Sequence, residues 1–139
     1  MLEVRDGDAV SPLPAVSNAM VRLHKEQFGR GPTIARSHFA GPDMLICALE
    51  DALLPAELKM AAMGEQQRVR ESRVAFQAAT YDEFVAAVED IVGRKVRAFG
   101  SSFDVEQNVV FETFLFESSA GSADGDANGD GYAADGHGA

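Results

Sequence analysis

Apolar residues along the chain recur at helical spacing and then in short runs, and this succession occurs twice. In the first half, Val16, Met20, Leu23 and Phe28 form a stripe typical of an amphipathic helix. Two short runs follow, separated by the turn-forming sequence Gly-Pro-Asp at 41–43. Because runs joined by a short turn are typical of a hairpin, this half predicts a helix followed by two antiparallel strands.

The first helix is predicted to begin at Ser17 or Asn18, whose side chains can cap its first turn. Pro12 and Pro14 precede these residues, and two closely spaced prolines disfavour a helix. Residues 1–14 are therefore expected to form a flexible arm ahead of the domain.

Helical spacing returns at residues 54–62, and Gly64 is expected to weaken or bend the run that follows. Thr80 and Glu83 have the spacing of a capping box, which predicts that another helix begins there. Its apolar stripe consists of Phe84, Val88, Ile91 and Val92. A turn near 104–108 between two further runs predicts a second hairpin.

The two halves share residues when "GRGPTIARSHF" is laid on "GRKVRAFGSSF" without a gap. The identical pairs are Gly29 with Gly93, Arg30 with Arg94, Ser37 with Ser101, and Phe39 with Phe103. The same alignment places Leu45, Cys47 and Leu49, which share one face of their strand, opposite Val109, Phe111 and Thr113. Chance similarity between common helix-turn-strand signals is the alternative explanation.

The fold class predicted from this repeat is α+β. Two helix-strand-strand repeats form a four-stranded, mainly antiparallel sheet with helices on one face, and an extra helix links them. An open sheet of this kind leaves edges that a second copy of the chain could cover, so a homodimer is a further expectation.

Charge and composition limit the possible functions. The 139 residues carry a formal net charge of −10, and 46% of them are hydrophobic, as in soluble globular proteins. An acidic chain is a poor candidate for nucleic-acid binding, because affinity for phosphates depends on clustered Lys and Arg. Residues 118–139 are small, polar and acidic, which predicts a disordered Gly/Ala/Asp-rich tail after a single domain at 15–117.

The sole cysteine, Cys47, cannot form an internal disulfide, and no apolar run approaches the roughly 20 residues that cross a bilayer. The first residues lack the basic and apolar regions of a signal peptide. We therefore expect a cytoplasmic protein without a membrane span.

The glycines of "FGRGPTIARSHF" (28–39) invite comparison with a phosphate-binding loop. In such loops the glycines precede a helix, whereas here they follow one, and the negative end of the helix dipole disfavours an anion. Gly29, Gly31 and Pro32 are instead typical of a helix stop and a turn, as is Gly93 in the second half.

Turn formation leaves a set of arginines unexplained: Arg30, Arg36, Arg70, Arg73 and Arg94. Arginine makes planar contacts with carboxylates and phosphates, and Arg70 and Arg73 are i,i+3 neighbours that can face one partner. We predict that these side chains bind a protein partner. In the alternatives, Arg30, Arg36 and Arg94 hold a small anion such as bicarbonate or a nucleotide, or the arginines face only water.

The tail contains a pattern that matches the ligand positions of a calcium-binding EF-hand loop: Asp124, Asp126, Asn128 and Asp135. No amphipathic helix flanks the pattern, Gly131 occupies the usual apolar anchor position, and Asp135 is shorter than the usual glutamate. A solubilising tail is therefore preferred, and no metal site or cofactor is predicted.

No catalytic motif is present, so the chain is predicted not to be an enzyme. Cys47 alternates with leucines and is interpreted as core. A metal site built from His24 or His38, and a hydrolase that uses His38 with a carboxylate, are the alternatives.

Several segments together resemble the MpsC family of small bacterial proteins over about residues 15–117. The resemblance rests on Gly29-Arg30-Gly31-Pro32, the segment 54–58 with Glu57, Val69-Arg70 with Arg73, and Gly93-Arg94 with Val96. Where the family usually has a threonine, this chain has Leu54, which removes an expected helix cap.

The resemblance implies association with a sodium-translocating, membrane-potential-generating system linked to inorganic-carbon uptake. A chain without a membrane span would serve such a system as an accessory or regulatory protein, which we expect to bind a protein partner or a membrane complex.

Overall fold

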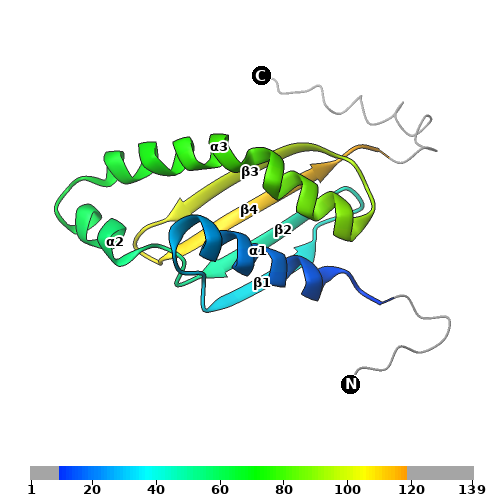
Figure 1. Ribbon diagram of the computed structural model, residues 1–139, viewed down its shortest axis with the longest axis horizontal. Coiled ribbons are helices and arrows are strands. Elements are labelled where there is room, and N and C mark those ends of the chain that lie inside the picture. The colour runs from blue at the N-terminus through cyan, green and yellow to red at the C-terminus, as the bar shows by residue number, and fades with distance from the viewer. Residues whose placement is uncertain (1–9, 119–139) are drawn as a thin grey trace.

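The helices of the computed structural model, which describes residues 10–118, lie on one face of a single sheet (Figure 1). The elements in chain order are α1 (Leu13–Phe28), β1 (Ile34–Phe39), β2 (Met44–Glu50), α2 (Pro55–Ala62), α3 (Gln66–Val92), β3 (Val96–Asp104) and β4 (Val109–Phe116). The sheet has four antiparallel strands in the order β1-β2-β4-β3. The predicted α+β class is confirmed.

The first helix begins earlier than its sequence suggests. Pro12 is the residue before the helix and Leu13 is its first residue, so the predicted caps at Ser17 and Asn18 are wrong. Pro14 is tolerated because amide groups in the first helical turn have no partner within the helix. The helix ends as predicted at Gly29, which has a φ of 89°.

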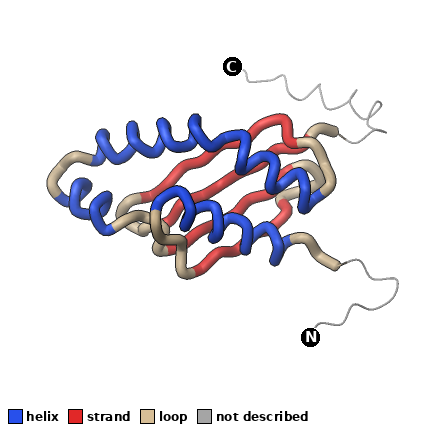
Figure 2. The backbone as a smooth tube through the Cα atoms, in the orientation of Figure 1, coloured by secondary structure: helices blue, strands red, loops and turns tan. Residues whose placement is uncertain are grey.

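A single long helix passes through Thr80, where a new helix was predicted to begin. α3 is continuous from Gln66 to Val92, and the Thr80 hydroxyl donates to the carbonyl of Phe76 at 2.8 Å. This side chain therefore bonds back to its own helix, and the predicted capping box is wrong. Gly64, with a φ of 86°, separates α2 from α3. Figure 2 shows α1 and the second half of α3 crossing the same face of the sheet.

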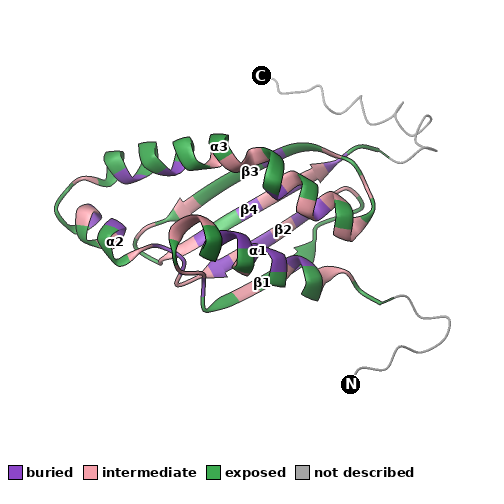
Figure 3. Ribbon diagram, viewed as in Figure 1, coloured by how far each residue is buried: buried purple, intermediate pink, exposed green. Residues whose placement is uncertain are grey.

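The core lies between these two helices and the inner strands (Figure 3). Leu45, Cys47 and Leu49 of β2 are fully buried, which confirms their predicted common face. The helices contribute Val16 and Met20 from α1 and Phe84 and Val88 from α3.

In β4, the second strand of the second repeat, the residues that face the core lie one position later than the predicted alignment places them. Phe111 is 38% exposed and faces away from the helices, whereas Val110 and Phe114 are buried. The hairpin turn accounts for the shift: five residues separate the partners Phe39 and Leu45 in the first hairpin, whereas six separate Phe103 and Val110 in the second. One extra residue reverses which side chains face the core. The prediction that Val109, Phe111 and Thr113 are the equivalents of the buried residues Leu45, Cys47 and Leu49 is therefore wrong.

With this shift included, the two repeats are related by an approximate two-fold axis. Cys47 lies opposite Glu112 at the centre of the β2–β4 pair, with Leu45 opposite Phe114 and Leu49 opposite Val110 on either side. This arrangement is what two copies of a helix-hairpin unit give when their second strands pair.

Candidate functional site

The two Gly-Arg corners bind the chain's own backbone. Arg30 donates to the carbonyls of Asp51 and Leu53 at 3.0 and 3.3 Å, and to the Asp51 carboxylate at 3.1 Å. At the other end of β2, Arg94 donates to the carbonyl of Pro42 at 2.7 Å and to the Asp43 carboxylate at 2.9 Å. Both arginines therefore fix the chain at an end of β2.

The glycines and proline of the first corner shape the turn that follows α1. Gly29 and Gly93 have φ values of 89° and 77°, which residues with a β-carbon rarely adopt. A β-carbon on Gly31 would lie 2.8 Å from the carbonyl oxygen of Val21, so the turn packs closely against α1. Pro32 is buried beside it.

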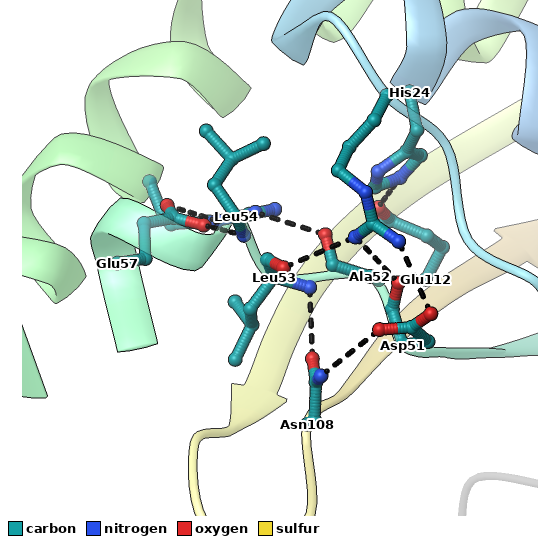
Figure 4. Close-up of polar contacts among 10 residues, drawn as sticks. His24, Asp51, Ala52, Leu53, Leu54, Glu57, Asn108 and Glu112 are labelled. Carbon is teal, nitrogen blue, oxygen red and sulfur yellow. Dashed lines mark hydrogen bonds and ion pairs between the residues drawn. The ribbon is translucent and has the colours of Figure 1, made fainter. Parts of the chain in front are cut away.

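The loop from β2 to α2 is held by hydrogen bonds from several elements (Figure 4). Asp51 has a φ of 59°, and its amide donates to the carbonyl of Asn108 at 2.9 Å. The Asn108 side chain accepts from the amide of Leu53 at 2.9 Å. The β3–β4 turn thereby fixes the path of the loop.

Arg73 on α3 fixes the start of α2. Its guanidinium donates two hydrogen bonds to Glu57, at 2.8 and 2.7 Å, and lies 4.1 Å from the ring centroid of Phe28. Glu57 also accepts from the amide of Leu54 at 2.8 Å. The departure at Leu54 therefore removes the side-chain cap, while Glu57 still satisfies the amide there.

The remaining arginines lie in different environments. Arg36 is exposed on β1 and pairs with Glu50, on the face of the sheet away from the helices. Arg70 lies on α3 with its guanidinium 5.7 Å from the ring centroid of Phe103. Of the five predicted side chains, Arg70 and Arg73 line one groove, whereas Arg30, Arg36 and Arg94 lie elsewhere.

A buried histidine–carboxylate pair lies between α1 and the sheet. Nε2 of His24 is 2.7 Å from Oε2 of Glu112, and the two side chains are 2% and 4% exposed. The rings of Phe28 and Phe84 lie 5.7 and 5.6 Å from the imidazole. Among the described residues, Nδ1 of His24, Oε1 of Glu112 and Oε1 of Gln27 are buried without a hydrogen-bond partner.

Glu112 belongs to a polar row that crosses all four strands on the helix-covered face. Ser37, Cys47, Glu112 and Ser101 are consecutive cross-strand partners. The Ser37 hydroxyl lies 2.7 Å from that of Ser17 and donates to Cys47 Sγ at 3.4 Å. Burial raises the pKa of the Cys47 thiol to about 11, a change that the hydrogen bond from Ser37 opposes.

Sequence reasoning missed the His24–Glu112 pair. The two residues are far apart in the chain, and the strand register that brings them together depends on the length of the β3–β4 turn. One signal was available, since Glu112 shares its strand face with Val110, Phe114 and Phe116, which places a carboxylate in an apolar stripe.

Two adjacent spaces lie beside this pair. The inner one has a volume of about 20 Å³ and is lined by His24, Gln27 and Glu112, among others. The outer one, a groove of about 260 Å³ between α3 and β3, is lined by Arg70 and Phe103. The two spaces share Arg73, Gln77 and Ser101.

Other sequence candidates fall outside this site. His38 is exposed on β1, and the calcium-like pattern in the tail lies beyond the described residues. Within residues 10–118, no cluster of three potential metal-binding side chains occurs. None of the described helices combines the length and the apolar character that membrane crossing requires.

Comparison with known proteins gives one match. Residues 14–118 match the family model described as Na+-translocating membrane potential-generating system (MpsC). No curated protein and no solved structure matches the chain.

Proposed function

Because this chain belongs to the MpsC family, we propose that it is a non-enzymatic cytoplasmic accessory or regulatory protein of a Na+-translocating, membrane-potential-generating system. In this role it binds a protein component of that system. The family description supports the link to the system, and an apolar surface of the sheet supports the binding role.

The observation that carries the proposal is the sheet face opposite the helices, which we call the open face. Its apolar side chains alternate with the core residues along each strand: Ile34, Met44, Ile46, Val109, Phe111 and Leu115. Ile34 and Phe111 are 47% and 38% exposed. No described helix covers this face (Figure 1).

The open face has about half the area of one side of a standard protein interface. Four strands about 4.8 Å apart and about seven residues long give a surface of roughly 400 Å². The largest contiguous apolar patch of a soluble monomer, about 300–600 Å², is often functional. A partner that docks there needs an apolar surface flanked by charge, since Arg36 and Glu50 border the patch at one end.

The contacts that the arginines make within the chain limit which of them can bind a partner. Arg30, Arg73 and Arg94 are held by carboxylates and carbonyls of the chain itself, so binding a partner would require these contacts to break. Arg36 lies on the open face and is the arginine best placed to contact a partner there. A shared anion site for Arg30, Arg36 and Arg94 is not favoured, because each has its own acidic partner.

Co-purification of the tagged chain from native membranes tests the proposal. The double variant Ile34→Lys/Phe111→Lys places charge on the open face, and Met63→Lys changes a side chain that is 68% exposed elsewhere. We expect the wild type and Met63→Lys to recover an integral membrane subunit, identified by mass spectrometry, and the double variant to lose it.

Light scattering on the purified chain distinguishes the main alternative. A wild-type dimer that the double variant converts to a monomer, with no membrane subunit recovered, would show that a second copy covers the open face. That result would overturn the proposed partner.

A further inference from the structure

We propose that the two adjacent spaces between α1, α3 and β3 together bind a small zwitterion of the amino-acid class. Its ammonium group lies against Glu112, and its carboxylate pairs with Arg70. This site is on the helix-covered side of the sheet and is independent of the open face.

The inner end requires hydrogen-bond donors. Oε1 of Glu112 and Oε1 of Gln27 are buried acceptors without a partner among the described residues. An unsatisfied buried acceptor costs about 1–3 kcal/mol, and more when it is charged. This demand persists whether or not His24 carries a second proton, because both atoms are oxygens that accept in either state.

The size of the inner space limits what can supply these donors. Its volume of about 20 Å³ is close to that needed for one water molecule, so a head group no larger than an ammonium fits. Phe28, Phe84 and Phe99 line the same space. Aromatic rings attract cations, which favours an ammonium over a neutral group of the same size.

The outer end offers a cation. Among the described residues Arg70 has no carboxylate within 4.0 Å, and its guanidinium lies 5.7 Å from the ring centroid of Phe103. Its neighbour Arg73 is already paired with Glu57 through two hydrogen bonds. Arg70 is therefore the side chain that can take a carboxylate in the planar geometry that arginine favours.

The opposite charges at the two ends select a zwitterion over simpler ligands. A plain amine would satisfy Glu112 but would gain nothing from Arg70, which is exposed and hydrated without a ligand. A plain carboxylate would pair with Arg70 but would leave the inner acceptors without donors. The groove of about 260 Å³ between α3 and β3 has room for the linking atoms of a small molecule.

Isothermal titration calorimetry with matched probes tests the assignment. Glycine, 4-aminobutyrate and 6-aminohexanoate vary the separation of the two charges, while butylammonium and butyrate each carry one of them. We expect one zwitterion to bind with a Kd at least tenfold lower than that of either single-charge probe. Glu112→Gln and Arg70→Gln should each weaken that zwitterion at least tenfold.

Arg68→Gln is the matched control, because Arg68 lies on the same helix, pairs with Glu65 and is not among the groove-lining residues. Should Glu112→Gln fail to fold by circular dichroism, Ser101→Leu replaces it, since Ser101 lines the junction of the two spaces. We expect Ser101→Leu to abolish zwitterion binding and to leave recovery of the membrane subunit unchanged.

Two results would overturn the assignment. Absence of binding by every zwitterion to the folded wild type would rule out the assigned ligand class. Equal affinity of the wild type and Ser101→Leu would place the ligand at another site. Neither result bears on the open face, whose test uses different variants.

Discussion

The two faces of the sheet differ in where polar side chains lie. The helix-covered face has a polar row at its centre, with Cys47 and Glu112 as its inner members. The open face is mainly apolar, with Ile46 and Phe111 on its inner strands. The sheet therefore carries apolar side chains on both faces, and its buried polar side chains, Ser37 and Glu112, lie on the covered one.

Phenylalanine truncation on β4 should show the largest contrast between the faces. Phe114→Ala removes a ring that is 0% exposed and should lower the free energy of unfolding by about 3–5 kcal/mol. Phe111→Ala, on the open face of the same strand, should cost less than about 1 kcal/mol. Urea unfolding of both variants measures the difference, and similar costs would mean that the isolated chain buries the open face.

The two ion pairs on opposite sides of the sheet give the next contrast. Arg73→Met leaves the Glu57 carboxylate buried without its partner and should cost about 3 kcal/mol. Arg36→Met removes the exposed pair with Glu50 and should cost about 0–1 kcal/mol. Denaturant midpoints measured at low and high salt check both values, and only the Arg36 pair should show marked screening.

Arg30 and Arg94, the arginines of the two Gly-Arg corners, should contribute equally to stability if the repeats are equivalent. Arg30→Ala and Arg94→Ala each remove three hydrogen bonds to the chain, so we expect each to cost about 1–3 kcal/mol. Thermal unfolding compares them. A cost confined to one variant would show that only one corner stabilises the fold.

The Cys47 thiol should have the smallest effect on stability, and that effect should depend on pH. Because its pKa is raised from 9.0 to about 11, the unfolded chain loses this proton first as pH rises, and stability falls between these values. At pH 10 the loss should be about 1 kcal/mol. The difference between wild type and Cys47→Ala in urea midpoints from pH 8 to 10 isolates this term, and a constant difference would contradict it.

The thiol should also resist iodoacetamide at pH 7.5 until the chain is denatured, because the thiolate is the reactive form. Mass spectrometry of the native and denatured chains measures this. Rapid labelling of the native chain would show that the centre of the covered face opens to solvent.

The sequence predicted local features well where neighbouring residues decide them. The stop at Gly29, the turn at 41–43 and the common face of β2 were all readable, since turn chemistry and alternation are local. The cap predicted at Thr80 failed because packing against the sheet continues the helix through it.

Features that depend on register or distance were not readable. The face of β4 was assigned wrongly because one extra residue in the β3–β4 turn decides it. The pairing of His24 with Glu112 joins the first helix to the last strand. The prediction that the five arginines bind a partner or an anion stays a prediction, although the structure shows that three of them contact their own chain.

The central pairing of β2 with β4 also affects how the chain folds. Each hairpin closes a short loop, whereas the contact between Cys47 and Glu112 must bring together strands separated by α2, α3 and β3. Because closing a long loop costs entropy before contacts compensate for it, we expect the two hairpins to form first and their docking to limit the folding rate.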